Sequence, residues 1–250
     1  MARLKFMNTE IDNLTMKETL QAIDSLIKEN KNAYVVTPNV DHIVQLETNR
    51  ELQDVYANAS LILTDGKPLL WIAKWYGTPI KEKISGSDLF PLLCDMASKK
   101  GYKMFFLGAA EGVAAKAAEN LAKRYKGLQV VGTYSPPYGF EKNPEEMDKI
   151  KGMLKEANPH ILIVGLGCPK QEKFMYHHCE ELGVPISFGL GASFDFEAGN
   201  IKRAPRWMAD HGLEWLFRIT QDPKRMAKRY LVDDRKILGL AIKYRKVTGK

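Results

Sequence analysis

Short apolar runs alternate with longer amphipathic segments along residues 1–195, and this alternation is the strongest constraint on the fold. Runs such as AYVVT (33–37), YKMFFLG (102–108) and HILIVGLG (160–167) are apolar on both strand faces, while the segments between them repeat apolar residues at helical spacing. Strands of that kind are typical of a parallel sheet that is covered by helices on each side. The sequence therefore predicts an α/β fold with a Rossmann-like parallel sheet and helices on both faces.

The pattern changes after Gly199, beyond which no further strand is evident. Residues 204–220 and residues 223–247 each predict a single helix, the second bounded by Pro223. We therefore expect an α/β catalytic body over residues 1–195 and a helical appendage over residues 196–250. Within the body, residues 40–59 predict one helix, and residues 189–199 predict a loop that follows a strand.

Positive charge is concentrated in the predicted appendage. The chain carries a formal charge of +7, and residues 201–250 hold 14 Lys and Arg against 5 Asp and Glu. Such a segment favours a polyanionic partner (nucleic acid, anionic lipid headgroups or a diphosphate), and the alternative is a solvated helical surface. Three cysteines without metal-ligand spacing, no apolar run of transmembrane length and no signal-like N-terminus lead us to expect a cytoplasmic protein.

Ligands of open parallel sheets bind beyond the carboxyl ends of the strands. The loops expected there, such as LGAAEG (107–112) and GLGCPKQEK (165–173), are rich in small residues and lead into helices, which suits a phosphate or a ribose. The alternative for each glycine is a tight turn. Neither G-x-G-x-x-G nor a P-loop motif occurs, so a dinucleotide cofactor is weakly supported. The candidate substrate-binding residues in these loops are Gly108, Ala109, Gly165, Gly167 and Lys170, and the side chain of Gln171, a candidate catalytic residue, can also point into the cleft.

An acidic residue ends another apolar run, LILTDGKPLL (61–70). Asp65 could be a turn residue, a metal ligand or a catalytic base. The ligand interpretation is the weakest, because no second carboxylate stands at ligand spacing. A short D-x-E pattern at Asp195 and Glu197 is a weak metal candidate, the histidines form no ligand motif, and Cys168 best fits a buried turn thiol. We expect no cofactor and metal-independent chemistry.

Five blocks in order resemble the WecG/TagA/CpsF family of bacterial glycosyltransferases: TPNVDH, TDG, GLGCPKQEK, GASFDFEAGNIKRAP and GLEWLFRITQDPKR. The resemblance covers essentially the whole chain. It implies transfer of a hexose or an N-acetylhexosamine, such as N-acetylmannosamine, from a UDP-sugar to an undecaprenyl-diphosphate-linked saccharide. The transfer would invert the anomeric carbon at the inner face of the cell membrane, in cell-surface polysaccharide or wall teichoic acid synthesis. Family members also suggest a homo-oligomer.

The resemblance assigns roles to particular residues by their place in these blocks. Asp65 matches the proposed general base, Thr37 and Asn39 match polar residues on the acceptor side, and Gln171 matches a glutamine beside the reacting sugar. Asp195 matches an aspartate of the nucleotide-side loop. The expected diphosphate-binding cations are Arg218, Arg225 and either Lys228 or Arg229. Where the family often has arginine this chain has Lys83, which keeps the charge but loses the bidentate fork.

An inverting transfer needs a base for the acceptor hydroxyl and positive charge for the departing UDP. With a weak metal motif and a basic appendage, we predict a metal-independent, peripheral membrane enzyme whose appendage closes over the diphosphate and meets anionic lipid. Seven appendage residues could insert at the membrane or instead pack against protein: Trp215, Leu216, Phe217, Tyr230, Leu231, Ile237 and Leu238. The alternatives are a nucleotide-sugar epimerase or dehydrogenase, and a nucleic-acid-binding module, for which the appendage has no recognisable motif; we expect no nucleic acid partner.

Overall fold

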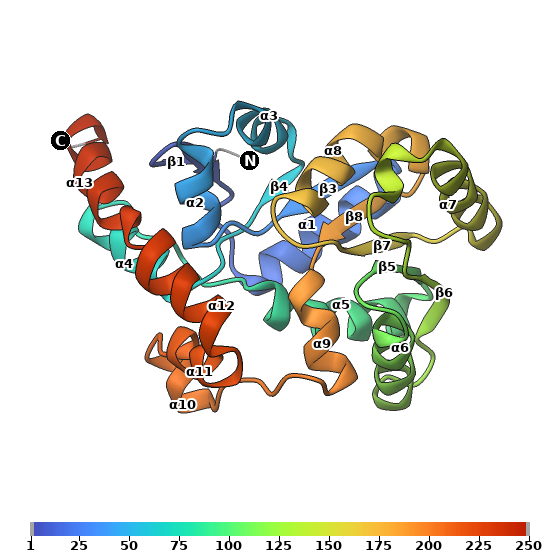
Figure 1. Cartoon of the computed structure of the whole chain (residues 1–250). Coiled ribbons are helices and arrows are strands. Elements are labelled where there is room, and N and C mark those ends of the chain that lie inside the picture. The colour runs from blue at the N-terminus through green and yellow to red at the C-terminus, as the bar shows by residue number, and fades with distance from the viewer. Residues whose placement is uncertain (1–2, 249–250) are drawn as a thin grey trace. The chain divides into compact units, whose positions relative to one another are not determined.

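The computed structural model describes residues 3–248 and divides into two compact units, each built from segments that are distant in sequence (Figure 1). Unit 1 comprises residues 1–15, 37–85 and 201–250, and unit 2 comprises residues 16–36 and 86–200. The boundary expected near residue 195 stays a prediction. The C-terminal segment belongs to the same unit as the segments that carry Asn39 and Asp65.

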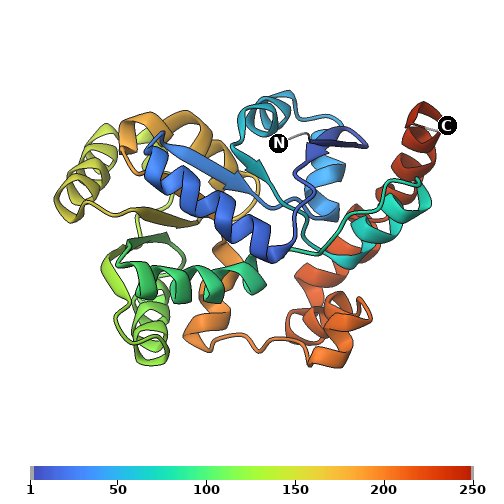
Figure 2. The same ribbon diagram turned by 180° about the vertical axis from the view of Figure 1, so that it is seen from behind.

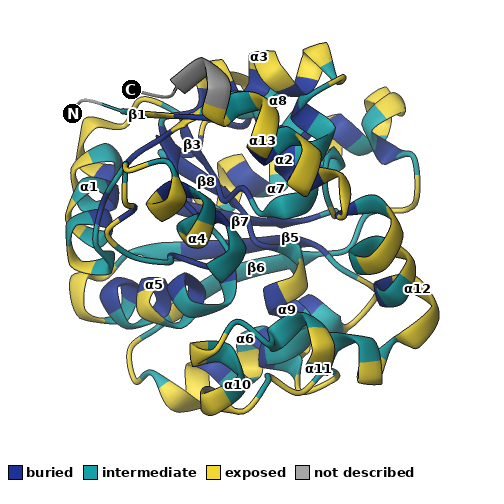
Figure 3. Cartoon of the chain, turned by 90° about the vertical axis from the view of Figure 1, so that its left-hand side faces the viewer, coloured by how far each residue is buried: buried dark blue, intermediate teal, exposed yellow. Residues whose placement is uncertain are grey.

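Unit 2 contains a parallel sheet in the order β3 (Ala33–Val36), β8 (Ile186–Gly189), β7 (Ile161–Gly165), β5 (Lys103–Gly108) and β6 (Gln129–Tyr134). Strands β3, β7 and β8 are buried along their whole length, because helices cover both faces of the sheet. Figure 3 shows these strands in the colour of buried residues. The predicted α/β class, with its parallel sheet, is confirmed.

Six helices cover the sheet of unit 2. Helices α7 (Pro144–Ala157) and α8 (Lys170–Leu182) pack together on one face (Figures 1 and 2). The other face carries α1 (Met16–Glu29), α5 (Gly86–Lys100), α6 (Val113–Arg124) and α9 (Gly191–Ala198). Phe90, Phe106 and Phe194 form a fully buried cluster on this face, with ring centroids 5.3–5.7 Å apart. A 3₁₀ turn, η1 (Phe140–Lys142), precedes α7.

Unit 1 begins with an antiparallel hairpin of β1 (Leu4–Phe6) and β2 (Thr9–Ile11), which confirms the expected strand or hairpin. The expectation concerned residues 4–11, whose sequence LKFMNTEI predicts a strand or a hairpin. The central segment of unit 1 contains α2 (Val40–Leu46), α3 (Arg50–Asn58), β4 (Leu61–Ile62) and α4 (Lys67–Trp75). The C-terminal segment contains α10 (Arg206–Asp210), α11 (Glu214–Gln221), α12 (Pro223–Ala227), the π-helical η2 (Lys228–Asp233) and α13 (Lys236–Thr248).

The C-terminal segment is anchored to the rest of unit 1 by polar contacts. The Tyr76 hydroxyl donates to the carbonyl of Ala241 at 2.7 Å. Glu47 accepts from the Tyr244 hydroxyl at 2.9 Å and forms an ion pair with Lys243. These contacts hold α13 beside α2, so the segment is an integral part of this unit rather than a free tail.

Four predictions of local structure were wrong in detail. Residues 40–59 form two helices, because Asn49 caps a new one by accepting a hydrogen bond from the Leu52 N–H at 3.1 Å. Residues 191–198 form a helix rather than a loop. The two long helices expected after residue 203 are interrupted by the left-handed Gly212, at φ +72°, and by η2, while Asp222 caps α12.

Within residues 3–248, no helix has both the length and the apolar character that a membrane-spanning segment requires.

Candidate active site

Asp65 follows β4 in a turn that the backbone holds in place. The Asp65 N–H donates to the carbonyl of Pro38 at 2.8 Å, and the Ile84 N–H donates to the carbonyl of Thr64 at 2.8 Å. Gly66 adopts φ +98°, a conformation that side-chain-bearing residues rarely take, and α4 starts directly after it. The turn therefore places Asp65 beside the 37–39 loop and the 83–85 loop of unit 1. These loops carry Thr37, Asn39 and Lys83, which we expect to act together with Asp65.

The carboxyl of Asp65 has a raised pKa. Burial is the main cause, and the negative charge of Glu214 adds to it, whereas the positive charges of Arg218 and Lys83 oppose it. The residue as a whole is only partly buried. A carboxylate that is poorly solvated yet accessible is well suited to accept a proton, because desolvation increases its basicity.

Two of the predicted cations, Lys83 and Arg218, lie in this environment. Lys83, whose side chain is mostly buried, forms an ion pair with Glu214 of α11 at 3.6 Å. Arg218, also on α11, acts on Asp65 through its charge. Helix α11 therefore supplies both a cation and an anion to the surroundings of Asp65, and Glu214 was not among the residues that we expected there.

Asn39 is the N-cap of α2, and its side chain has several partners. Its Oδ1 lies 2.9 Å from His42 Nδ1 and 3.4 Å from the His42 N–H, and it accepts from Arg229 of η2 at 3.2 Å. Thr37, two residues earlier, is buried. The side-chain oxygen of Asn39 is therefore held in a fixed position by its neighbours within unit 1.

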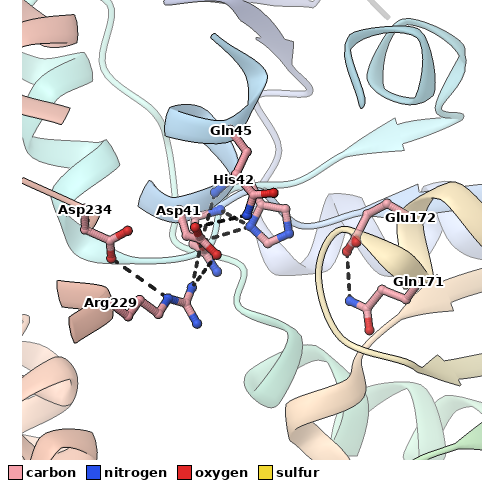
Figure 4. A network of polar contacts seen from close by, with 8 residues as sticks. Asp41, His42, Gln45, Gln171, Glu172, Arg229 and Asp234 are labelled. Atoms are coloured by element: carbon pink, nitrogen blue, oxygen red, sulfur yellow. Dashed lines mark hydrogen bonds and ion pairs between the residues drawn. The ribbon is translucent and has the colours of Figure 1, made fainter. Parts of the chain in front are cut away.

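Arg229 is the centre of a charged network in unit 1. Besides Asn39, its guanidinium lies 3.5 Å from the Asp41 carboxylate and 4.0 Å from that of Asp234 (Figure 4). Burial, together with the negative charges of Asp41 and Asp233, raises the pKa of Asp234 to about 6, although Arg229 opposes the shift. Lys228 and Arg229 were the alternatives for the third diphosphate-binding cation. Of these two residues, Arg229 is the one that contacts Asn39.

Arg225 lies apart from this network. It is largely exposed and forms an ion pair with Asp222 at 2.6 Å, in the turn that starts α12. Lys228 follows as the C-terminal cap of α12. The diphosphate-binding roles of Arg225 and Lys228 stay predictions.

In unit 2, the glycine-rich strand ends are closely packed backbone. Gly108 adopts φ +103°, and a Cβ there would lie 2.5 Å from the carbonyl oxygen of Gly165. The next residue, Ala109, donates its N–H to that oxygen at 2.7 Å. A Cβ on Gly165 would lie 2.6 Å from the Phe194 ring. Close packing accounts for the absence of a side chain at Gly108 and at Gly165. Gly167, at φ +78°, forms the turn that leads toward α8.

Gln171 lies at the same sheet edge, at the start of α8. It lies against the last residue of β8 and the first residue of α9. A Cβ on Gly189 would lie 2.9 Å from Gln171 Nε2, and one on Gly191 would lie 2.9 Å from Gln171 Oε1. Its neighbour Lys170 pairs with Glu141 at 3.0 Å instead of extending freely. The two glycines make the space that the Gln171 amide fills.

The D-x-E pattern lies on α9, and its two carboxylates do not converge. Glu197 is buried and forms an ion pair with Arg124 of α6 at 2.8 Å, while Asp195 accepts from Asn200 at 3.2 Å. Residues two apart on a helix point in different directions. The pair therefore does not form a chelating site by itself, and Asp195 remains a candidate for contact with the nucleotide.

Comparison with known proteins places this geometry in a class of enzymes. Residues 4–250 match the model of the glycosyl transferase WecG/TagA/CpsF family. The chain therefore belongs to this family of glycosyl transferases. A relative in Bacillus spizizenii, named N-acetylglucosaminyldiphosphoundecaprenol N-acetyl-beta-D-mannosaminyltransferase, is 31% identical over 99% of this chain and 92% of its own length. A relative of the same name in Bacillus subtilis is 30% identical over 80% of this chain and 75% of its own length. Another of the same name, in Staphylococcus aureus, is 25% identical over 91% of this chain and 88% of its own length.

Proposed function

We propose that the protein transfers a sugar of the N-acetylmannosamine type from a UDP-sugar to an undecaprenyl-diphosphate-linked saccharide, with inversion at the anomeric carbon. The observation that carries this proposal is the desolvated Asp65 carboxyl at the end of β4, with the charges of Arg218 and Lys83 acting on it. The names of the relatives in Bacillus and Staphylococcus supply the acceptor and the sugar class.

In the proposed reaction the acceptor hydroxyl attacks the anomeric carbon of the donor. Asp65 takes the hydroxyl proton, the new glycosidic C–O bond forms, and the bond to the UDP oxygen breaks with its electron pair leaving on UDP. Cations near the departing diphosphate would lower the barrier by stabilising the charge that develops there. We assign this task to appendage cations and propose that no metal ion is needed.

The surface of unit 1 supports a peripheral membrane location at the inner face of the cell membrane. Leu216, Leu231 and Leu238 of the C-terminal segment are exposed, as are Trp71 and Trp75 on α4. Ile237, one of the residues considered for insertion, is buried instead, and Trp215 packs edge-on against Tyr230 with ring centroids 6.2 Å apart. Exposed apolar side chains among basic residues favour binding to anionic lipid.

A donor screen tests the proposal. Purified protein is incubated with a short-chain analogue of undecaprenyl-diphosphate-N-acetylglucosamine and one UDP-sugar at a time, with EDTA in a parallel set. We expect transfer from UDP-N-acetylmannosamine at equal rates in both sets. Loss of transfer in EDTA with recovery on adding Mg²⁺ or Mn²⁺ would refute the metal-independent chemistry. Conversion of the donor without any acceptor would favour a nucleotide-sugar-modifying enzyme.

A further inference from the structure

The side chains of Gln171 and Glu172 form a buried pair in unit 2 (Figure 4). Gln171 Nε2 donates to Glu172 Oε1 at 2.8 Å. Glu172 is 2% exposed and Gln171 is 7% exposed. Glu172 Oε1 is the acceptor in this contact, so the N–H₂ end of the Gln171 amide is the end that faces Glu172.

The other end of the same amide has no hydrogen-bond partner within residues 3–248. Gln171 Oε1 is buried, and it lies where a Cβ on Gly191 would approach it to 2.9 Å and would also lie 3.2 Å from the Cα of Gly165. This is the carboxyl edge of the sheet, at the ends of β7 and β8. A buried carbonyl oxygen without a partner costs stability, which is consistent with an acceptor that a ligand satisfies.

We propose that Glu172 is a positioning residue that makes Gln171 a dedicated hydrogen-bond acceptor, so that the ligand group bound there is a donor. A hydroxyl of the transferred sugar, its acetamido N–H or the uracil N–H has the required chemistry. A phosphate oxygen or a carbonyl oxygen does not. The inference rests on the proposed function only for the identity of the ligand, since the polarity of the pair follows from the contacts of Gln171 and Glu172.

Exchanging the two side chains tests the polarity. In Glu172→Gln the amide of Gln171 loses the partner that orients it, and in Gln171→Glu two carboxylates face each other. The double variant Gln171→Glu/Glu172→Gln restores one amide and one carboxylate, with an acceptor oxygen again directed at the ligand. By isothermal titration with UDP and with UDP-N-acetylmannosamine, we expect each single variant to bind the nucleotide sugar, or both probes, about tenfold more weakly. The double variant should recover most of that loss.

The two probes locate the ligand group. Loss of affinity for both UDP and UDP-N-acetylmannosamine assigns the ligand group to the nucleotide, and loss for the nucleotide sugar alone assigns it to the sugar. Unchanged affinity in Glu172→Gln, or a double variant weaker than both single variants, would overturn the proposal. Gly191→Ala should weaken binding by displacing Oε1, whereas Gly152→Ala, where a Cβ meets nothing within 4 Å, is the matched control.

A readout without any ligand separates this inference from the proposed function. In the free protein, the side-chain N–H₂ protons of Gln171 should exchange slowly with solvent, because they are buried and bonded to Glu172. Glu172→Gln should accelerate that exchange while the backbone amides of α8 keep their protection. Equal exchange rates in the two proteins would contradict the positioning role even if no nucleotide binds, whereas a wild-type protein that transfers no sugar would refute the function alone.

Discussion

Arg229 donates a hydrogen bond to Asn39 Oδ1 at 3.2 Å, joining two residues that are 190 positions apart in the chain. Asn39 caps α2, two residues after Thr37, and its neighbour Pro38 accepts the backbone N–H of Asp65 at 2.8 Å. One side chain of the C-terminal segment therefore holds a loop on which the candidate base rests. This contact accounts for why a segment so distant in sequence could affect the chemistry of Asp65.

Replacing Arg229 should impair catalysis. In Arg229→Ala we expect kcat/KM to fall about tenfold, the effect of losing one charge-assisted hydrogen bond, and Tm to fall as well, because Asp41 and Asp234 lose their cation. Arg235, which is exposed on the same segment, is the matched control because Arg235→Ala removes the same charge away from Asn39. Equal losses in the two variants would mean that Arg229 contributes only to the net charge.

The acid limb of the pH–rate profile should follow the charges around Asp65. A base works only when ionised, so kcat/KM should fall as the pH drops through the raised pKa of Asp65. Glu214→Gln removes a charge that raises this pKa and should move the limb to lower pH. Lys83→Met removes a charge that lowers it and should move the limb to higher pH, whatever happens to the maximal rate. Shifts in the same direction in both variants would refute the assignment of Asp65 as the titrating base.

Asp234 should make unit 1 less stable as the pH rises. Its pKa is raised from 3.8 to about 6, so the folded state binds the proton more tightly than the unfolded state does. Its contribution to stability is therefore present below pH 3.8 and is lost as the pH rises through about 6. Asp234→Asn should remove this dependence, making the variant more stable than wild type above pH 6 by on the order of 2 kcal/mol. Urea unfolding of both proteins at pH 5 and pH 8 measures the change in the free energy of unfolding with pH. The same change in wild type and in Asp234→Asn would contradict the raised pKa of Asp234.

Exposed and buried apolar residues of the C-terminal segment should behave differently. Leu238 is 69% exposed on α13, and its neighbour Ile237 is 8% exposed. We expect Leu231→Ser/Leu238→Ser to weaken sedimentation with liposomes of anionic lipid while leaving Tm nearly unchanged. Ile237→Ser should lower the stability instead, by about 2–4 kcal/mol, because it removes buried apolar surface and buries a hydroxyl. Undiminished liposome binding by the double leucine variant would exclude these side chains from the membrane contact.

The sequence predicted the class of the sheet and most of its elements, because two-sided apolar runs such as 161–165 leave few alternatives. It misplaced the helix breaks at Asn49 and Gly212, since periodicity continues across both positions while a capping side chain or a left-handed glycine decides the local geometry. Local chemistry outweighed periodicity in both cases.

The candidate site was only partly predictable. Asp65 stood out as an acid at a strand end, and the glycines at 108 and 165 were visible, at positions where close packing leaves no room for a Cβ. Contact of these two glycines with a ligand stays a prediction. Glu214, Glu172 and Asp234 were missed. Their importance comes from side-chain contacts with Lys83, the Gln171 amide and Arg229, and the spacing of residues along the chain does not predict such contacts. The one available signal was the position of Glu172 directly after Gln171.

The transfer rate of Asp65→Asn, measured beside its stability, tests the central claim most directly. Asparagine keeps the shape of the side chain but cannot take up the proton of the acceptor hydroxyl. We expect kcat to fall by about 10²–10⁴-fold, the usual contribution of a general base, in a variant that retains UDP binding and a Tm no lower than wild type. A variant that is equally folded and transfers sugar at the wild-type rate would contradict the role of Asp65 as the base.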